Sequence, residues 1–257
     1  MTDEPRSEID GAQDHGEGNR AGGTAPRIAT PRVWALTLTA GLLGGLAAWV
    51  VGEAVLQTYR PALEPPFKPI PTLDDSLKVT RARVESGAAI AAATSALVGF
   101  ALGVAGGAAR RSVKLMPGAG GAGLLLGAVL GAAVGTALMT ALYANLDPQS
   151  GNLLIPLLGH IGAWSVAGLA GGFAFGAGAG GKRVLARTTV GGLVGVALAS
   201  VVYELVGALA FPTHETHLPI AGSPETRALA LVLVGLGAAI GAVVAVDEPK
   251  PRRPVQG

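Results

Sequence analysis

Four ionisable side chains lie within or at the ends of long apolar segments of this chain: Glu53, His160, Glu204 and Arg227. A carboxylate in lipid is costly unless it is paired or hydrated, so an acid inside an apolar segment is a candidate functional residue by default. Glu53 and Glu204 could form a pair of acids in an outward-facing polar vestibule, with His160 or Arg227 as counter-groups. Such a vestibule would bind or relay a proton or another cation.

The depth of the two glutamates favours a plainer interpretation. Each lies eight residues before a proline that ends its apolar segment, Pro61 and Pro212, and eight residues of helix span only about 12 Å. At that depth a side chain can reach headgroup water or join two helices through an ion pair. We therefore expect all four ionisable residues at one level near the outer leaflet rather than at the bilayer midplane.

Other motifs give weaker signals. His214 and His217 lie three apart and could share a helix face as zinc ligands, with His160 as a third. The chain has no cysteine and no HExxH motif, so a polar loop is the favoured interpretation. The stretch 176–183 (GAGAGGKR) differs from a phosphate-binding loop, which needs Ser or Thr where this chain has Arg183. Without a nucleophile–base pair or a metal cluster, the sequence predicts no catalytic residue, no metal, no cofactor and no enzyme.

The composition is that of a membrane protein. Half of the 257 residues are hydrophobic and only 14% are charged, whereas about 25% is usual for soluble domains. Mean hydropathy is +0.49. The net charge of +2 is modest and the basic residues are spread among loops, so nucleic acid is not an expected partner.

Six apolar segments are each long enough to cross a hydrocarbon core of about 30 Å, which takes about 20 helical residues; they cover residues 33–57, 87–109, 121–144, 155–180, 189–211 and 227–246. Helices satisfy their own backbone groups in lipid, and no segment alternates like a barrel strand. The predicted fold class is all-α, a polytopic membrane protein with six transmembrane helices.

The flanking segments complete the expected organisation. Residues 1–31 are expected to form a disordered cytoplasmic tail, 32–247 the transmembrane domain and 248–257 a basic cytoplasmic tail. The first segment lacks the features of a cleavable signal, so the first span should act as an uncleaved signal anchor. Asp74 or Asp75 is expected to cap a helix that leads straight into the second span.

Small residues recur at fixed distances before three prolines, Pro61, Pro148 and Pro212. Superimposing the prolines aligns small residues in rows four positions apart: Ala40, Gly127 and Gly191; Gly44, Gly131 and Gly195; Ala48, Gly135 and Ala199. Small residues at this spacing let transmembrane helices approach closely. The sequence thus predicts three tandem helical hairpins with pseudo-threefold symmetry, in which the odd-numbered helices pack through Gly44, Gly127, Gly131, Gly135, Gly191 and Gly195. Such glycine rows could instead line a pore, but close helix packing is the commoner use.

The basic residues predict the orientation. Cytoplasmic loops are enriched in Lys and Arg, and the second and fourth loops carry Arg110, Arg111 and Lys114 and Lys182, Arg183 and Arg187. Both termini should therefore be cytoplasmic, in a bacterial inner membrane. Residues 58–86 are also basic, but they carry acids as well, and the count of spans places them outside. Aromatic residues are expected at the interfaces, with Trp34 inside and Tyr59, Tyr143, Trp164 and Phe211 outside.

Two functions stay open at this level. The first is a non-catalytic integral membrane protein with a scaffold or interaction role through its glycine-rich helix faces. Its partners would be the lipid bilayer, a second copy or another membrane protein. The alternative is a small transporter or channel for a proton or cation that uses Glu53, Glu204 and His160. Convergence of Glu53 and Glu204 on a shared cavity would favour transport.

Overall fold

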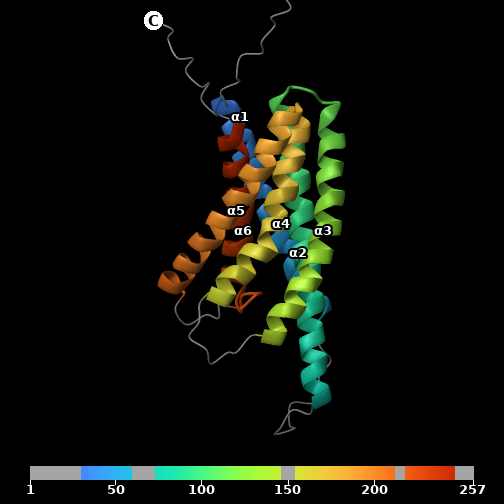
Figure 1. Ribbon diagram of the computed structural model, residues 1–257, viewed down its shortest axis with the longest axis vertical. Coiled ribbons are helices and arrows are strands. Elements are labelled where there is room, and N and C mark those ends of the chain that lie inside the picture. Colours follow the sequence, from blue (N-terminus) through green and yellow to red (C-terminus); the bar gives the residue numbers. More distant parts are fainter. Residues whose placement is uncertain (1–29, 60–72, 146–153, 212–217, 247–257) are drawn as a thin grey trace, which may run out of the picture.

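The computed structural model describes residues 30–59, 73–145, 154–211 and 218–246 of the chain. Within these residues all regular structure is helical, in six helices long and apolar enough to span a membrane. They are α1 (Pro31–Thr58), α2 (Leu73–Ala109), α3 (Leu115–Asn145), α4 (Leu154–Ala179), α5 (Lys182–Ala210) and α6 (Pro224–Val246) (Figure 1). The prediction of six apolar helices is confirmed.

The second helix is longer than a membrane requires. Its 37 residues span about 55 Å at the helical rise, and its first turns project beyond the rest of the bundle (Figure 1). The expected helix leading into the second span is therefore present, but its start differs from the prediction. Asp74 and Asp75 lie in the first turn rather than at the N-cap, where their charge favours the helix dipole.

The even-numbered helices form the interior of the bundle and the odd-numbered helices cover it. Helix α1 packs between α6 and α2, α3 between α2 and α4, and α5 between α4 and α6. Among the described residues, no two odd-numbered helices contact each other. Burial agrees with this order. In each even-numbered helix, half of the residues in an apolar stretch of 18 residues are buried, whereas in each odd-numbered helix only 28–33% of them are. The odd helices therefore present most of their apolar surface outward.

Glycines set the close helix contacts. A Cβ added at Gly45 would meet the carbonyl oxygen of Leu231 on α6 at 2.5 Å, and one at Gly131 would meet Ala91 on α2 at 2.7 Å. Gly191 and Gly195 lie against Gly241 and Gly237 of α6, and Gly127 lies against the backbone of Ser95 on α2. Contacts this close leave no room for a side chain, so backbones pack directly on backbones. Gly180 and Gly181 have positive φ, which allows the tight turn between α4 and α5.

The packing does not reproduce the predicted equivalence of the three glycine rows. The aligned glycines Gly44 and Gly195 lie against the helix that follows their own, α2 and α6. Gly131 lies instead against α2, the helix that precedes its own, while Gly135 also faces α2 at Ala88 and Ala91. The glycines of α1, α3 and α5 thus pack on even helices, not on one another. A four-residue spacing specifies that a face can pack closely, but not which neighbour it meets.

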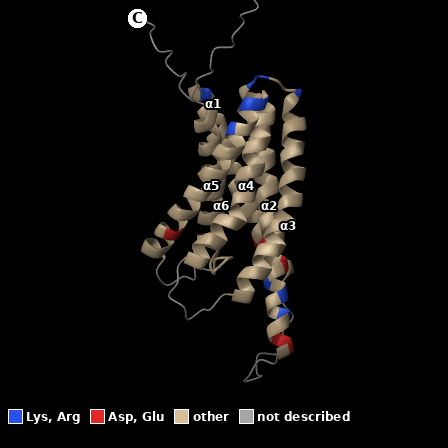
Figure 2. Ribbon diagram, viewed as in Figure 1, with Lys and Arg blue, Asp and Glu red and all other residues tan. Residues whose placement is uncertain are grey.

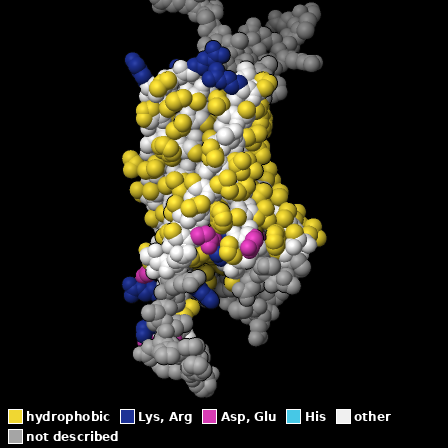
Figure 3. All heavy atoms as spheres, turned by 180° about the vertical axis from the view of Figure 1, so that it is seen from behind, with side chains coloured by type: hydrophobic (Ala, Val, Ile, Leu, Met, Phe, Trp, Pro, Cys, Tyr) yellow, Lys and Arg dark blue, Asp and Glu magenta, His cyan; other side chains and the backbone are white. Residues whose placement is uncertain are grey.

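The charged residues gather toward the two ends of the bundle (Figure 2), and hydrophobic side chains cover most of the face between them (Figure 3). One end, here called the basic end, carries seven Lys and Arg residues of the described chain: Arg32, Arg110, Arg111, Lys114, Lys182, Arg183 and Arg187. All described acidic residues lie toward the opposite end, here called the acidic end, where α1, α3 and α5 finish and α2, α4 and α6 begin. The other four described Lys and Arg residues lie there too: Lys78, Arg81, Arg83 and Arg227. The four candidate residues belong to this acidic end.

Candidate functional site

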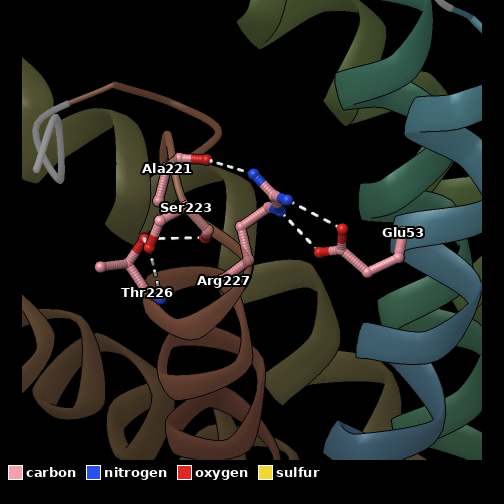
Figure 4. Close-up of polar contacts among 5 residues, drawn as sticks. All are labelled: Glu53, Ala221, Ser223, Thr226 and Arg227. Atoms are coloured by element: carbon pink, nitrogen blue, oxygen red, sulfur yellow. Dashed lines mark hydrogen bonds and ion pairs between the residues drawn. The ribbon is translucent and has the colours of Figure 1, made fainter.

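Glu53 and Arg227 join α1 to α6 through a two-pronged ion pair (Figure 4). The guanidinium Nε donates to Glu53 Oε1 at 2.7 Å and Nη2 donates to Oε2 at 2.8 Å. A third donor, Nη1, contacts the carbonyl oxygen of Ala221 at 2.8 Å. The side chains are only 26% and 16% exposed, so the pair is partly shielded from solvent. This parallel geometry is the strongest that Arg and a carboxylate can adopt.

The start of α6 fixes the position of Arg227. Ser223 precedes the helix, and its hydroxyl accepts a hydrogen bond from the backbone N–H of Thr226 at 3.3 Å. The Thr226 hydroxyl donates in return to the Ser223 carbonyl at 2.9 Å. Serine at the N-cap followed by Pro224 is a strong helix start. The Arg227 side chain therefore projects from the first turn of α6, beside Ala221 and toward Glu53 of α1 (Figure 4).

His160 and Glu204 join α4 to α5. His160 Nδ1 lies 2.5 Å from Glu204 Oε1, and Nε2 lies 3.0 Å from the Leu218 carbonyl oxygen. A carbonyl can only accept, so Nε2 carries a hydrogen. Two lone pairs would repel at the Nδ1 contact, so that contact also contains one hydrogen, on Nδ1 or on Oε1. His160 and Glu204 are therefore joined by a hydrogen bond whose hydrogen lies on Nδ1 or on Oε1.

An aromatic cluster surrounds this pair. The His160 ring stacks on Trp164 with centroids 4.6 Å apart, and Tyr203 meets both rings edge-on at 5.4 and 5.1 Å. His160 and Tyr203 are buried. Stacked and edge-on pairs add to the stability that burial provides. Trp164, expected at the lipid interface, instead packs inside the bundle, because it lies one helical turn from His160 and shares its face.

A short segment before α6 contacts both ion pairs. His160 donates to the Leu218 carbonyl and Arg227 to the Ala221 carbonyl. Ala221 is buried, and the position of Ile220 beside Gly87 brings the same segment against α2. Residues 218–221 are thus held by α4 on one side and by α6 on the other. This places a piece of non-helical chain inside the acidic end of the bundle.

A small cavity of about 40 Å³ lies beside the Glu53–Arg227 pair. Its walls come from five helices and from the segment 218–221, and include Trp49, Glu53, Trp164, Tyr203 and Arg227. Glu204 and His160 are not among the lining residues. Glu53 and Glu204 therefore face different partners, and do not share this cavity.

The structure brings the four predicted residues together in two pairs, not in one group. The acids were expected as a pair with basic counter-groups, but each acid contacts its own base, Arg227 for Glu53 and His160 for Glu204. Sequence reasoning missed Tyr203 and Trp49, although Tyr203 directly precedes Glu204. His214, His217 and the three aligned prolines lie outside the described residues. Within the described part of the chain, no group of His, Asp and Glu side chains has a metal-binding arrangement.

No protein-family model matches the chain, and neither the curated proteins nor the solved structures contain a significant match. The geometry of the bundle is therefore the basis for the functional argument.

Proposed function

We propose that this chain is a non-catalytic integral membrane protein with a scaffold or interaction role. The observation that supports this most is the pairing of its charges. Each acid within a span is neutralised by a base on a neighbouring helix, through direct contacts of 2.5–2.8 Å. Removing one partner alone would leave an unpaired charge in a mostly apolar setting, so each pair favours this choice of neighbouring helices. Both carboxylate oxygens of Glu53 already accept hydrogen bonds from Arg227, which leaves them poorly placed to bind a transported ion.

The projecting start of α2 offers a surface for an interaction role. Leu73 and Leu77 are 79% and 60% exposed and lie one turn apart on this extension. Lys78 pairs with Asp74 and Arg81 with Glu85 across successive turns, which stabilises a helix in water. Two exposed leucines one turn apart on a charged helix are the kind of apolar anchor that helix recognition uses.

Photo-crosslinking in intact cells tests the interaction role. A benzoylphenylalanine at Leu77 should give a discrete cross-linked protein product, either with a second copy or with another protein. The matched control is the same residue at Leu198, which is 62% exposed on the outer face of α5 and should give diffuse lipid adducts. Absence of a protein product at Leu77 would contradict an interaction through this extension.

A proton-linked or cation transporter is the second candidate. It is favoured by the direct contact between His160 and Glu204, since proton relays in membranes use such acid–histidine contacts. Its test is uptake into proteoliposomes. Glu53→Gln and Glu204→Gln should then each reduce the flux, and unchanged flux in both variants would remove the acids from the mechanism.

We extend the proposal to the arrangement of the helices as three hairpins and to their orientation in the membrane. Three side-chain contacts between helices at the acidic end support a three-hairpin repeat. They are Arg227 with Glu53, His160 with Glu204, and the Arg83 guanidinium 6.0 Å from the centre of the Tyr143 ring. Each connects an even helix to an odd helix. The basic end, by the positive-inside rule, would be cytoplasmic, and the two termini would lie in the cytoplasm of a bacterial cell.

A further inference from the structure

A long apolar groove runs between α5 and α6 on the outer face of the bundle. Its volume is about 830 Å³, within the range of about 300–1,000 Å³ that is usual for sites that bind small molecules. On α5 the groove extends from Ala186 to Val202, which is about 24 Å at the helical rise. One leaflet of a hydrocarbon core is roughly 15 Å deep. The groove is therefore long enough to hold an acyl chain through a whole leaflet.

Small residues form the floor of the groove. Gly191, Gly195 and Ala199 follow one another at every fourth position of α5, and they meet Gly237 and Gly241 of α6. At these contacts the two helix backbones approach so closely that no side chain lies between them. The floor therefore offers an occupant backbone and methyl groups, with no charged side chain along this stretch.

Branched side chains form the two walls of the groove. They recur at every fourth position and are exposed on the outer face: Val190, Val194, Leu198 and Val202 on α5, and Ile240 and Val244 on α6. An occupant that lies along the groove would contact aliphatic carbon on both sides for most of its length. Such a surface fits a hydrocarbon chain.

A positive charge closes one end of the groove. Arg187 lines the groove and lies four positions before Gly191, so it continues the row of the floor. A long helical side chain points toward the N-terminus of its helix, which for α5 is the basic end of the bundle. Arg183 lies one turn further along the same face, and both arginines are exposed. A guanidinium has five N–H donors, so Arg187 can bind a phosphate oxygen and keep its interaction within the protein.

Charge selects among the occupants that fit this groove. A second copy in the same membrane, or a helix of another protein that follows the positive-inside rule, would present its own Lys and Arg residues at this level. It would therefore meet Arg183 and Arg187 with like charge. An anionic phospholipid instead supplies a negative headgroup at this level and an acyl chain for the groove beside it.

We propose that the groove between α5 and α6 binds one phospholipid with a net negative headgroup. The phosphate would contact Arg187 and Arg183, and an acyl chain would lie on the row of small residues that begins at Gly191. The site is independent of the interaction role of the α2 extension and of transport, since it lies at the other end of the bundle and uses none of the paired acids.

Photolabelling of the full-length protein tests where the lipid binds. The protein is placed in nanodiscs with equal amounts of phosphatidylglycerol and phosphatidylcholine, one of which carries a diazirine in its acyl chain. The phosphatidylglycerol probe should label the groove residues of α5 and α6 more than the outer face of α3 at Leu125 and Val129, which are equally open. The phosphatidylcholine probe should label the two faces alike. Even labelling by phosphatidylglycerol, or equal labelling of the groove by both probes, would overturn the site.

Native mass spectrometry in a mild detergent tests the role of the charge. The wild type should retain phosphatidylglycerol in preference to phosphatidylcholine with the same acyl chains. Arg187→Gln should lower this preference about fivefold, since one basic residue near a membrane surface contributes about that factor. Arg111→Gln is the matched control, because Arg111 is exposed at the basic end but is not among the residues that line the groove. It should leave the preference unchanged.

A bulky substitution tests the groove itself without changing any charge. Val194→Trp places an indole between the two walls and should reduce the amount of phosphatidylglycerol retained. Retention equal to that of the wild type, or equal effects of Arg187→Gln and Arg111→Gln, would contradict the site. A dimer of the wild type that Val194→Trp disrupts would identify a second copy as the occupant and overturn the proposal.

Discussion

Arg227 and Glu53 lie 174 positions apart in the sequence, and their side chains form a two-pronged ion pair between the last and the first helix of the bundle. Together with the packing of Gly41 and Gly45 on α6, this contact closes the ring of outer and inner helices. At the acidic end, the ion pair adds a polar contact to the apolar packing between α1 and α6.

Removing one member of this pair should destabilise the protein more than removing both. Glu53→Leu leaves the Arg227 guanidinium without its carboxylate in a mostly apolar setting, and should lower the free energy of unfolding by about 1–3 kcal/mol. The double variant Glu53→Leu/Arg227→Leu should recover part of this loss, because no unpaired charge remains. Chemical unfolding in detergent measures both, and simply additive losses would contradict the pairing.

The hydrogen bond between His160 and Glu204 predicts a difference between two substitutions at Glu204. A glutamine amide can donate to neutral Nδ1, so Glu204→Gln should cost less than about 1 kcal/mol. Glu204→Leu leaves His160 Nδ1 without a partner and should cost about 1–3 kcal/mol. The comparison is made by the same unfolding titration. Equal losses in the two variants would show that the hydrogen bond contributes nothing.

Two glycines of α3 should respond oppositely to the same change. Gly127 lies against the backbone of Ser95, so Gly127→Ala should lower stability by about 1–3 kcal/mol through overpacking. Gly121 has no atom within 4 Å of an added Cβ, so Gly121→Ala should be neutral or stabilise by up to about 1 kcal/mol. Thermal unfolding distinguishes them. A similar cost at both positions would mean that α3 does not pack on α2 through Gly127.

The proposed orientation can be tested with single cysteines, since the chain has none of its own. Thr80→Cys lies exposed on the α2 extension at the acidic end, and Val113→Cys lies exposed at the basic end. A membrane-impermeant maleimide should label Thr80→Cys in intact cells and Val113→Cys only after lysis. The reverse pattern would place the basic end outside and contradict the orientation.

The sequence was sufficient to predict which segments form apolar helices. It was not sufficient to predict which side chains on different helices contact each other. The apolar segments gave the six helices because hydropathy and length alone decide spanning capacity. The position of Glu53 and Glu204 at one end of the bundle could be predicted, because both lie near the ends of apolar segments that run in the same direction. Their partners did not, because the assignment of Arg227 to Glu53 and of His160 to Glu204 depends on which helices are neighbours.

Helix order was the missing information. Glycine rows show that a face packs closely, and Gly131 could equally have met α4 as α2. Tyr203 was overlooked and Trp164 was placed at the lipid interface, because an aromatic residue in an apolar segment looks the same whether it faces lipid or a buried histidine. The four-residue spacing of His160 and Trp164 was the available signal, since it places both rings on one face.

We propose that the paired charges at the acidic end join neighbouring helices and do not carry ions. Proton and potassium flux into liposomes containing the wild-type protein tests it most directly, with a pH dye and an imposed ion gradient. We expect flux equal to that of protein-free liposomes, in the wild type and in Glu53→Gln and Glu204→Gln alike. Flux above that background in the wild type, lost in either variant, would contradict it.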